Sequence, residues 1–364
     1  MNNTEKEFDL LVFVGRFQPL HLEHKRVIDI ALQKSRHVLV LVGSAGKART
    51  IRNPFTFDER RDMITGCYEN DWDVIDPEGQ TERRLIIRPL YDKTYNDAAW
   101  VKQVQELVKD TTLDVMNPSG FMASGYNDAK VGLIGASKDN SSYYLKLFPQ
   151  WKSVNVEIEA DVHATTIRES FLEYSCWKPA SVPSNVADFM TQFTYTAPYA
   201  QLKSELQFVR DYKKQWEVSP YPVKHATVDA VVEQSGHILL VKRKAEPGKG
   251  LWALPGGHLN EFEKQLDGAI RELREETGKW MSVHELDEKI ASEHVFDHPK
   301  RDPRGRCVTH AFLFKLHDKG PLPLVEADDD ASEALWMPFS DVIANEEQFY
   351  ADHCSIINYF VSKL

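Results

Sequence analysis

The stretch from Gly257 to Lys279 constrains this chain more than any other part of it. Its sequence is GHLNEFEKQLDGAIRELREETGK, and apolar residues recur three and four apart in it, at Leu266, Ala269, Ile270 and Leu273. Asn260 is a suitable N-cap, Glu263 three residues later would complete a capping box, and Gly278 is placed to end the helix. The spacing therefore predicts a helix between Asn260 and Gly278.

Three glutamates occupy the neighbouring arc of this predicted helix. Glu272, Glu275 and Glu276 face the same way, so their carboxylates crowd together and repel one another. A hard divalent cation relieves that repulsion, and Mg²⁺ prefers carboxylate oxygens while keeping water for a substrate phosphate. Arg271 can brace Glu275 one turn away. The alternative is a solvated acidic helix with ion pairs four residues apart, which is the commoner fate of glutamate-rich helices.

This stretch resembles the Nudix box almost position for position: Gly257, five residues, Glu263, seven residues, then Arg-Glu-Leu-x-Glu-Glu-x-Gly. The Nudix family hydrolyses a nucleoside diphosphate linked to another moiety. The resemblance implies that Glu272, Glu275 and Glu276 ligate Mg²⁺, or Mn²⁺ in its place, and that Gly257 gives a backbone carbonyl. The last position of the box is usually aliphatic in the family but is Lys279 here, which affects packing more than chemistry.

Composition excludes several other classes of protein. A chain of 364 residues is long enough for two domains. Its net charge of −11 draws it to neither nucleic acid nor anionic membrane, so it must gather positive charge locally to bind phosphates. The four cysteines are scattered, which suits a reducing cytosol, and the polar N-terminus has no apolar stretch of a signal peptide. We expect a cytoplasmic protein with no membrane-spanning segment.

The first half opens with a β-α-β pattern. Residues 9–14 (DLLVFV) and 37–42 (HVLVLV) are apolar runs that predict parallel strands, with a helical pattern between them. The turn after the first strand carries Arg16, His21 and His24 at the start of that helix, where backbone N–H groups and the helix dipole bind anions. The two histidines face the same way and could stabilise a phosphate in a transition state. Alone, such a pair is more often a surface accident or a metal site.

The sequence GRFQPLHLEH resembles the nucleotidyltransferase superfamily marked by His-x-Gly-His, and within it the archaeal-like nicotinamide mononucleotide (NMN) adenylyltransferases. The resemblance implies that Gly15, Phe17, Arg16, His21 and His24 bind and activate ATP. Glu23 stands where the family has glycine, which puts the packing of ATP in question but removes neither histidine.

Further motifs of the same branch follow along the chain. The resemblance implies that Ser44, Asn53 and Arg60 shape the NMN side of the cleft and that Trp100 stacks on the nicotinamide. Asn53-Pro54 also reads as a plain loop before a helix, and Trp100 as a helix residue that covers the core. Lys138, at a strand-to-helix loop, would face a phosphate or solvent.

The sequence HATTIRESF resembles the second phosphate motif of the family, Ser-Ser-Thr-x-x-Arg. Thr165, with Thr166 beside it, would hold the β,γ-phosphates of ATP as an N-cap, and Arg168 would follow the leaving pyrophosphate. His163 and Ala164 replace the two serines. The NMN phosphate is already a nucleophile, so catalysis is positioning and charge neutralisation, with no covalent nucleophile required.

Prolines cluster before the second half, and Ser219-Pro220-Tyr221-Pro222 is the expected boundary. We predict a domain over residues 1–198, a connecting helix and linker over 199–222, and a second domain over 223–364. The cluster 301–306 (RDPRGR) and the segment 325–338 resemble Nudix enzymes that act on ADP-ribose. Arg243, Arg304 and Arg306 would bind a diphosphate, although an exposed basic loop is the alternative. The general base stays open, with Glu326 and Asp328–Asp330 as candidates.

The sequence thus predicts an α/β chain: a Rossmann-like nucleotidyltransferase with a parallel sheet, followed by an α+β Nudix fold. The resemblances imply a bifunctional enzyme that makes NAD from ATP and NMN and cleaves ADP-ribose to AMP and ribose 5-phosphate. Alternatives are an ADP-ribose sensor or another nucleoside diphosphate for the Nudix part, and nicotinate mononucleotide or another small phosphate for the first part. A homo-oligomer is left open.

Overall fold

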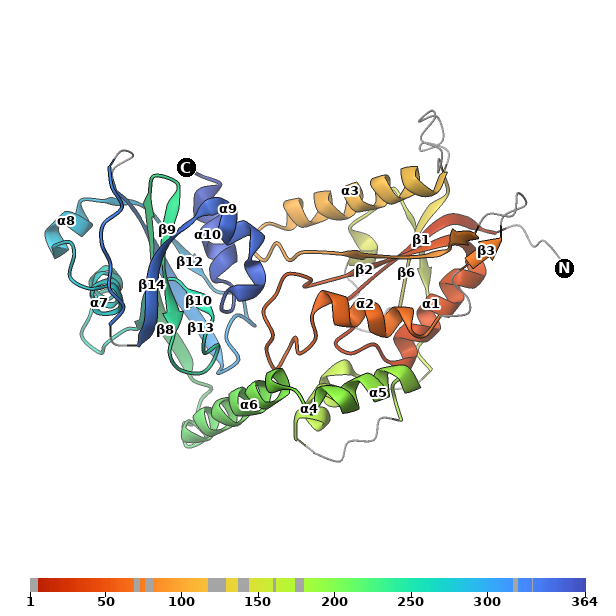
Figure 1. Ribbon diagram of the computed structural model, residues 1–364, viewed down its shortest axis with the longest axis horizontal. Coiled ribbons are helices and arrows are strands. Elements are labelled where there is room, and N and C mark those ends of the chain that lie inside the picture. Colours follow the sequence, from red (N-terminus) through yellow and green to blue (C-terminus); the bar gives the residue numbers. More distant parts are fainter. Residues whose placement is uncertain are drawn as a thin grey trace. The chain divides into compact units, whose positions relative to one another are not determined.

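The computed structural model describes residues 6–68, 73–75, 81–116, 129–136, 144–159, 162–173, 180–316, 320–328 and 330–364, with the backbone alone for 73–75 and 81–83. The chain divides into two compact units, Met1–Ala200 and Gln201–Leu364. Each unit has its own sheet and its own core, so each is described by itself (Figure 1).

The first unit is built on a parallel sheet of five strands in the order β5-β2-β1-β6-β7. The strands are β1 (Phe8–Gly15), β2 (Ser35–Val42), β5 (Leu85–Pro89), β6 (Val131–Gly135) and β7 (Lys152–Asn155). Two short strands, β3 (Asp73–Ile75) and β4 (Thr81–Arg83), form a separate antiparallel pair. Gly15 pairs with Val42 in register, so the carboxyl ends of the two central strands lie together. The parallel strands predicted for the opening of the chain are confirmed.

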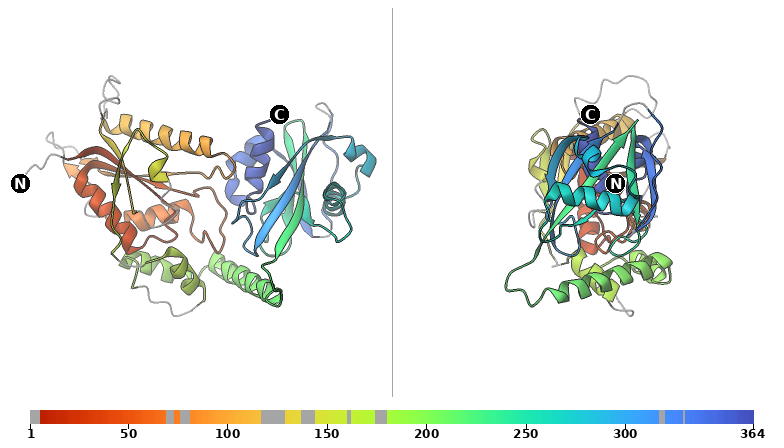
Figure 2. Two further views of the ribbon diagram at one scale, coloured as in Figure 1. Left: turned by 180° about the vertical axis from the view of Figure 1, so that it is seen from behind. Right: turned by 90° about the vertical axis from the view of Figure 1, so that its left-hand side faces the viewer.

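Helices cover both faces of this sheet. They are α1 (Leu22–Lys34), α2 (Phe57–Thr65), α3 (Asp97–Met116), α4 (Ala164–Glu173) and α5 (Ser184–Phe193). Figures 1 and 2 show α3 on one face, and α1 with α2 on the other. Leu10 and Val12 of β1 pack in one cluster with Val104 and Val108 of α3, because alternate residues of a strand point to the same face.

The second unit contains a mixed sheet in the order β10-β9-β8-β13-β12, with β11 on β8 and β14 on β9. Its strands are β8 (Lys224–Gln234), β9 (His237–Arg243), β10 (Trp252–Ala253), β11 (Gly256–His258), β12 (Ile290–Phe296), β13 (Arg306–Lys315) and β14 (Ala331–Pro338). Its helices are most of α6 (Ala197–Gln215), then α7 (Gln265–Thr277), α8 (Val283–Asp287), α9 (Phe339–Ala344), α10 (His353–Val361) and a 3-10 turn (Glu346–Gln348). The α/β class predicted for the whole chain is confirmed.

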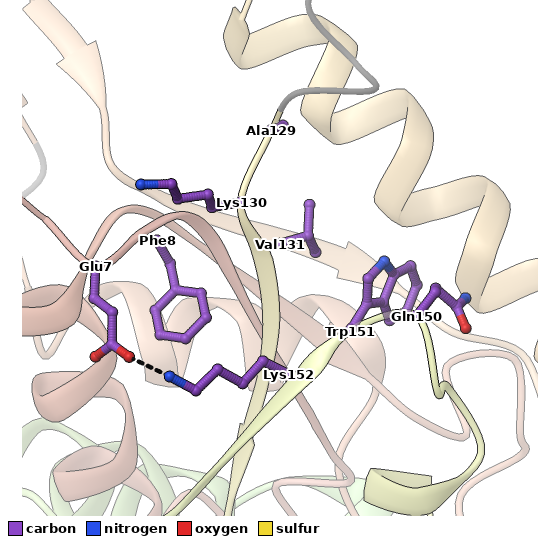
Figure 3. A pocket seen from close by; sticks show the side chains of 8 residues that line it. All are labelled: Glu7, Phe8, Ala129, Lys130, Val131, Gln150, Trp151 and Lys152. Atoms are coloured by element: carbon purple, nitrogen blue, oxygen red, sulfur yellow. Dashed lines mark hydrogen bonds and ion pairs between the residues drawn. The ribbon is translucent and has the colours of Figure 1, made fainter.

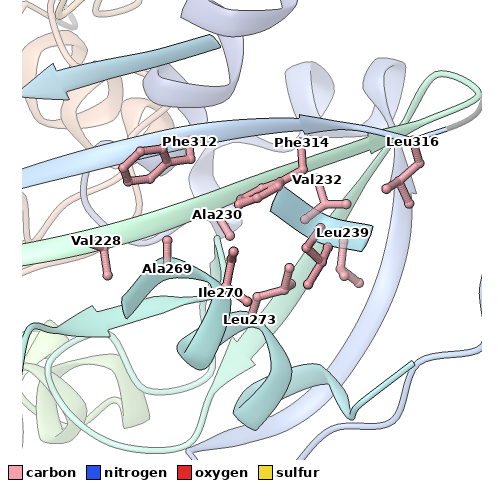
Figure 4. Close-up of a cluster of buried hydrophobic side chains, with 11 residues drawn as sticks. Val228, Ala230, Val232, Leu239, Ala269, Ile270, Leu273, Phe312, Phe314 and Leu316 are labelled. Atoms are coloured by element: carbon pink, nitrogen blue, oxygen red, sulfur yellow. The ribbon is translucent and has the colours of Figure 1, made fainter. Parts of the chain in front are cut away.

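The core of the second unit lies between α7 and one face of the sheet. Ala269, Ile270 and Leu273 of α7 pack against Val228 of β8, Phe312 of β13 and their neighbours (Figure 4). The opposite face carries α10, whose Phe360 ring lies 5.8 Å from that of Phe296. The apolar spacing read from the sequence therefore identified the buried side of α7.

The start of α7 differs from the prediction. The helix begins at Gln265 and not at Asn260, although Gly278, with φ of +84°, ends it as expected. Glu263 accepts a hydrogen bond from the Asn260 N–H, as in a capping box. Its carboxylate is also held by the Arg271 Nε at 2.7 Å and Nη2 at 3.0 Å, so it ties the preceding loop to the helix. Among the helices in the described ranges, none is long and apolar enough to span a bilayer.

Candidate active sites

The turn after β1 forms the floor of the first site. A Cβ on Gly15 would lie 2.8 Å from the ring of Phe17, so only glycine lets this ring fold over the end of the strand. Phe17 itself has φ of +51° and is buried. The turn then leads into α1, whose first backbone N–H groups and dipole favour an anion.

His21 and His24 form one stacked pair at the start of α1. Their ring centroids lie 3.5 Å apart with an interplanar angle of 18°, and His21 Nδ1 accepts a hydrogen bond from the His24 backbone N–H at 3.3 Å. Burial, and secondarily His21, holds the pKa of His24 well below its usual value. His24 Nδ1 is buried and has no hydrogen-bond partner among the described residues. His24 is therefore uncharged at neutral pH and retains an unused ring nitrogen.

Glu23 occupies the position where glycine was expected. Its carboxylate lies 3.8 Å from Arg26 Nη1 and accepts a long hydrogen bond, 3.5 Å, from the Glu159 backbone N–H. Arg26 in turn donates to the Glu157 carbonyl at 2.7 Å. The glutamate is therefore engaged with Arg26 and the segment after β7.

Three arginines gather at this site. Burial, and then the charge of Arg16, lowers the pKa of Arg52 to about 10, and burial with Arg16 and Arg52 lowers the pKa of Arg168 to about 10. Arg168 donates to the Gln18 carbonyl at 2.7 Å and to Thr165 Oγ1 at 3.1 Å. Asp92 offsets the charge and accepts a hydrogen bond from Ser44 Oγ at 2.9 Å. Such a group of cations is suited to a polyphosphate.

Arg52 and Asp92 are residues that the sequence reasoning missed. Arg52 sits directly before the Asn53-Pro54 motif that was noticed, so an unassigned cation beside that motif was the available signal. Asp92 lies in a loop after β5 and carried no pattern of its own.

Arg60 is fully buried, and its guanidinium is committed to the backbone. It donates to the carbonyls of Arg16 and Gly43 at 2.7 Å each, to Ser44 at 3.1 Å and to Thr56 at 3.0 Å. These bonds join the turns that follow β1 and β2. Arg60 therefore holds these two turns in place relative to each other.

Asn53, Trp100 and Thr165 show mixed outcomes. Asn53 Oδ1 is buried and accepts no hydrogen bond from the described residues. Trp100 is half-buried against the core cluster of the sheet, 6.2 Å from Phe148, as the core alternative supposed. Thr165 is not the N-cap, because α4 begins at Ala164; its hydroxyl instead orients Arg168. Thr166 follows it in the first turn of α4, and Lys138 lies outside the described residues.

A shallow hollow opens elsewhere in the first unit, and Figure 3 shows its lining side chains. It lies where β1, β6 and β7 begin, around Phe8, Val131 and Lys152, whereas the arginines and histidines follow the strand at its carboxyl end. In parallel sheets ligands bind at the carboxyl ends of the strands. We therefore place the first site with the histidine pair and not at this hollow.

The second site is formed by α7 and β11. Glu272 lies against Gly257 so closely that a Cβ on Gly257 would be 2.5 Å from Glu272 Oε1. Burial raises the pKa of the Glu272 carboxyl. Glu276 is buried, accepts a hydrogen bond from the Gly256 N–H at 3.0 Å, and has its pKa raised to about 8 by burial and then by Glu272 and Asp330 nearby. Oxygen donors packed against a glycine backbone in this way suit a hard divalent cation.

The third glutamate faces a different partner. Glu275 Oε2 accepts a hydrogen bond from Arg271 Nη1 at 2.7 Å, as the sequence suggested. Across the described ranges, no three acidic, histidine or cysteine side chains are grouped closely enough to hold a metal ion. The expected converging triad is therefore not preformed. Arg271 also lies 2.9 Å from Glu272, so the arginine takes part of the charge that the three carboxylates share.

The three arginines predicted to bind a diphosphate lie in separate environments. Arg243 stacks 4.3 Å from the Tyr350 ring centroid and acts electrostatically on Glu276. Arg304 pairs with Asp302 at 2.7 Å. Arg306 pairs with Asp297 at 3.1 Å and is more exposed. Arg304 is thus held by a defined contact, which does not fit the exposed-loop alternative for the 301–306 cluster.

The candidate general bases lie beside the end of α7. The Asp328 N–H donates to the Glu276 carbonyl and the Glu326 N–H to the Thr277 carbonyl, both at 3.2 Å. Asp330 acts electrostatically on Glu276, and Asp329 lies outside the described residues. The segment is placed next to the site through its backbone.

Two family assignments agree with these two sites. The family described as cytidylyltransferase-like matches residues 12–170, and the NUDIX domain matches residues 223–360. The fold and the sites thus define a chain that joins a nucleotidyltransferase to a Nudix domain.

Similar proteins point to one combination of these activities. A nicotinamide/nicotinic acid mononucleotide adenylyltransferase from Acinetobacter baylyi is 38% identical over 200 residues, covering 55% of this chain and 94% of that protein. An ADP-ribose pyrophosphatase from Methanocaldococcus jannaschii is 35% identical over 133 residues, 36% of this chain and 71% of that protein. A solved structure of a bifunctional NMN adenylyltransferase/ADP-ribose pyrophosphatase from Francisella tularensis, complexed with AMP and a Mn ion, covers 98% of this chain and 99% of that one, at 33% identity and a TM-score of 0.86. This chain belongs to the family of bifunctional NMN adenylyltransferase/ADP-ribose pyrophosphatases, as the resemblances implied.

Proposed function

We propose that the first unit joins ATP and NMN into NAD and pyrophosphate, and that the second unit hydrolyses ADP-ribose to AMP and ribose 5-phosphate. One contrast carries the proposal: the first site is lined by cations and imidazoles, and the second by carboxylates around a glycine backbone. The activities for which the relatives at 38% and 35% identity are named agree with this division. We also propose the boundaries 1–198, 199–222 and 223–364 for the two functional segments and the join.

In the first unit the oxygen of the NMN phosphate attacks the α-phosphorus of ATP, and the bond to the bridging oxygen of the leaving pyrophosphate breaks. Arg16, Arg52 and Arg168 neutralise the phosphates, since they lie together. The stacked His21 and His24 present ring nitrogens to the α-phosphate, where charge develops in the transition state. The phosphate nucleophile is already ionised, so none of these groups acts as a base.

Nicotinate mononucleotide is the alternative acceptor, and one observation separates it from NMN. The relative from Acinetobacter baylyi is named for both mononucleotides. Asn53 Oδ1 is buried and has no hydrogen-bond partner among the described residues, so it would accept a hydrogen bond from the N–H of a carboxamide, which a carboxylate lacks. We therefore propose NMN as the preferred acceptor.

In the second unit the chain requires a divalent cation, which we propose to be Mg²⁺, with Mn²⁺ able to replace it. Glu272, Glu276 and the Gly257 carbonyl would hold it, and Glu275 would join when it leaves Arg271. When bound, such a cation supplies charge neutralisation and a nucleophilic water. Arg243 and Arg304 orient the diphosphate, and the carboxylates of the 326–330 segment are placed to take a proton from water.

The experiment separates the two reactions in the full chain. We expect Glu275→Gln to abolish ADP-ribose hydrolysis while NAD synthesis continues at the wild-type rate. We expect His24→Ala to lower NAD synthesis about 100-fold or more, as the loss of one group that stabilises transition-state charge does, and to spare hydrolysis. Loss of both activities in either variant contradicts independent sites. A wild-type chain that binds ADP-ribose with Mg²⁺ but does not cleave it supports the sensor alternative instead.

A further inference from the structure

The end of α6 adds aromatic side chains to the second unit. Tyr212 lies on the last turn of α6, and Trp216 directly follows the helix. Both rings contact His225 of β8, with centroid distances of 5.5 Å from Tyr212 and 6.0 Å from Trp216. His225 lies 5.5 Å from His258 of β11. We refer to Tyr212, Trp216, His225 and His258 as the α6 aromatic patch.

This patch begins at the proposed cation site. His258 is the residue after Gly257 in β11, and its carbonyl accepts a hydrogen bond from Arg271 Nη2 at 3.2 Å. Gly257 pairs with Val228 of β8, three residues along the strand from His225. Two ring contacts, of 5.5 and 6.0 Å, therefore lead from the residue beside Gly257 to Trp216.

A proposed diphosphate ligand contacts the same patch. The guanidinium of Arg304 lies 5.6 Å from the centroid of the Tyr212 ring, and Asp302 holds it there. Burial lowers the pKa of the His225 and His258 imidazoles, and the charge of the nearby Arg304 lowers both further. The α6 aromatic patch thus contacts Arg304 through Tyr212 and adjoins the proposed cation site through His258.

The outer member of the patch is open to solvent. Trp216 is 45% exposed, although most of the large apolar side chains of this unit are buried. An indole that packs on neighbouring rings and leaves a face accessible has the form of a stacking platform. The rings of Tyr212, His225 and His258 continue this planar surface inward from Trp216, beside the Arg304 guanidinium.

We propose that the α6 aromatic patch is the nucleobase subsite of the second unit, with Trp216 stacking on the adenine of ADP-ribose while Arg304 holds the diphosphate. This inference rests on the proposed hydrolysis of ADP-ribose and names the side chains that select its base. Tyr212 is a positioning residue, because it lies between Arg304 and His225.

A consequence is that the hydrolase needs the end of α6, which lies within the proposed join. Tyr212 and Trp216 precede the proline-rich boundary at Ser219, so a cut there would remove them from the second domain. The compact unit that begins at Gln201 retains them.

The test compares variants of the full chain. We expect Trp216→Ala to raise KM for ADP-ribose about 5- to 100-fold, the range that loss of one base–aromatic stack produces, with kcat nearly unchanged. Inhibition by AMP should weaken by the same factor, whereas inhibition by ribose 5-phosphate should not change. Trp216→Phe should retain most of the effect of the indole. Tyr221→Ala, at a tyrosine 79% exposed beyond the patch, is the matched control and should behave as wild type.

An unchanged KM and unchanged inhibition by AMP in Trp216→Ala would overturn the proposed subsite. Equal weakening of inhibition by AMP and by ribose 5-phosphate would also overturn it. An effect of the same size in Tyr221→Ala would also overturn it. Calorimetric binding of AMP keeps the test separate from the proposed function. If the wild type does not cleave ADP-ribose, the proposed function fails, and a loss of AMP binding in Trp216→Ala still supports the subsite.

Discussion

Gly257 offers the sharpest test of the second site. A Cβ at this position would lie 2.5 Å from Oε1, 2.7 Å from Cδ and 3.0 Å from Oε2 of Glu272. An ordinary contact requires about 3.4–4 Å, so the carboxylate must move by about 1 Å. The moving atoms end a flexible side chain, so Gly257→Ala should cost the fold little, less than about 1 kcal/mol. A misplacement of about 1 Å in a positioned group lowers a rate about 100-fold.

We therefore expect Gly257→Ala to lose about 100-fold in ADP-ribose hydrolysis, while its thermal midpoint stays within a few degrees of the wild type. NAD synthesis by the same preparation reports on the first unit and should not change. Gly236→Ala is the control, because Gly236 has φ of +76° and open space around its Cβ position. That change should cost about 1 kcal/mol in stability and leave hydrolysis intact. Wild-type hydrolysis in Gly257→Ala would refute the placement of Glu272 against the glycine backbone.

Two further predictions concern stability. The side chain of Arg301 is 6% exposed, donates to Asp352 at 3.0 and 2.9 Å and lies 3.9 Å from Asp229. Arg301→Met should therefore destabilise the second unit by about 3–5 kcal/mol in denaturant unfolding, because it leaves buried carboxylates unpaired. Adding Asp352→Asn to this variant should recover part of the lost stability. Equal stability of the single and double variants would contradict this ion pair. His24 has its pKa well below the unfolded value of about 6.5, so the unfolded chain takes up a proton first as pH falls. The free energy of unfolding of the first unit should therefore decrease as the pH falls below about 6.5. His24→Gln should make this decrease shallower. The same dependence of stability on pH in the variant would show that His24 is not buried in its neutral form.

How far the sequence predicts this molecule depends on whether a property is local. The face of α7, the helix-ending Gly278 and the pairing of Arg271 with Glu275 follow from residues three to four apart, and all three are present. The start of α7 was misplaced because the capping bond between Asn260 and Glu263 forms without helix. The contact between Glu263 and Arg271 forms because the loop before α7 folds back onto the helix, which the local spacing does not reveal.

Non-local contacts account for the remaining differences at the sites. Arg52 and Arg168 are over a hundred residues apart, and only the parallel sheet brings them to one place, so no spacing rule identifies Arg52. The same holds for Trp216 and His258, which meet through His225 of β8. Arg60 was recognised as part of a motif, but the motif does not reveal that carbonyls of two separate turns occupy its donors.

The buried guanidinium of Arg60 has a consequence for how the first unit tolerates change. It is positioned by α2, whose first turn is fixed by the reciprocal bonds of Thr56 and Glu59. The cap of α2 and the turns that follow β1 and β2 are therefore coupled through one side chain. Loss of the cap would therefore displace these turns, where we propose that the nucleotide binds, before it disturbed the sheet.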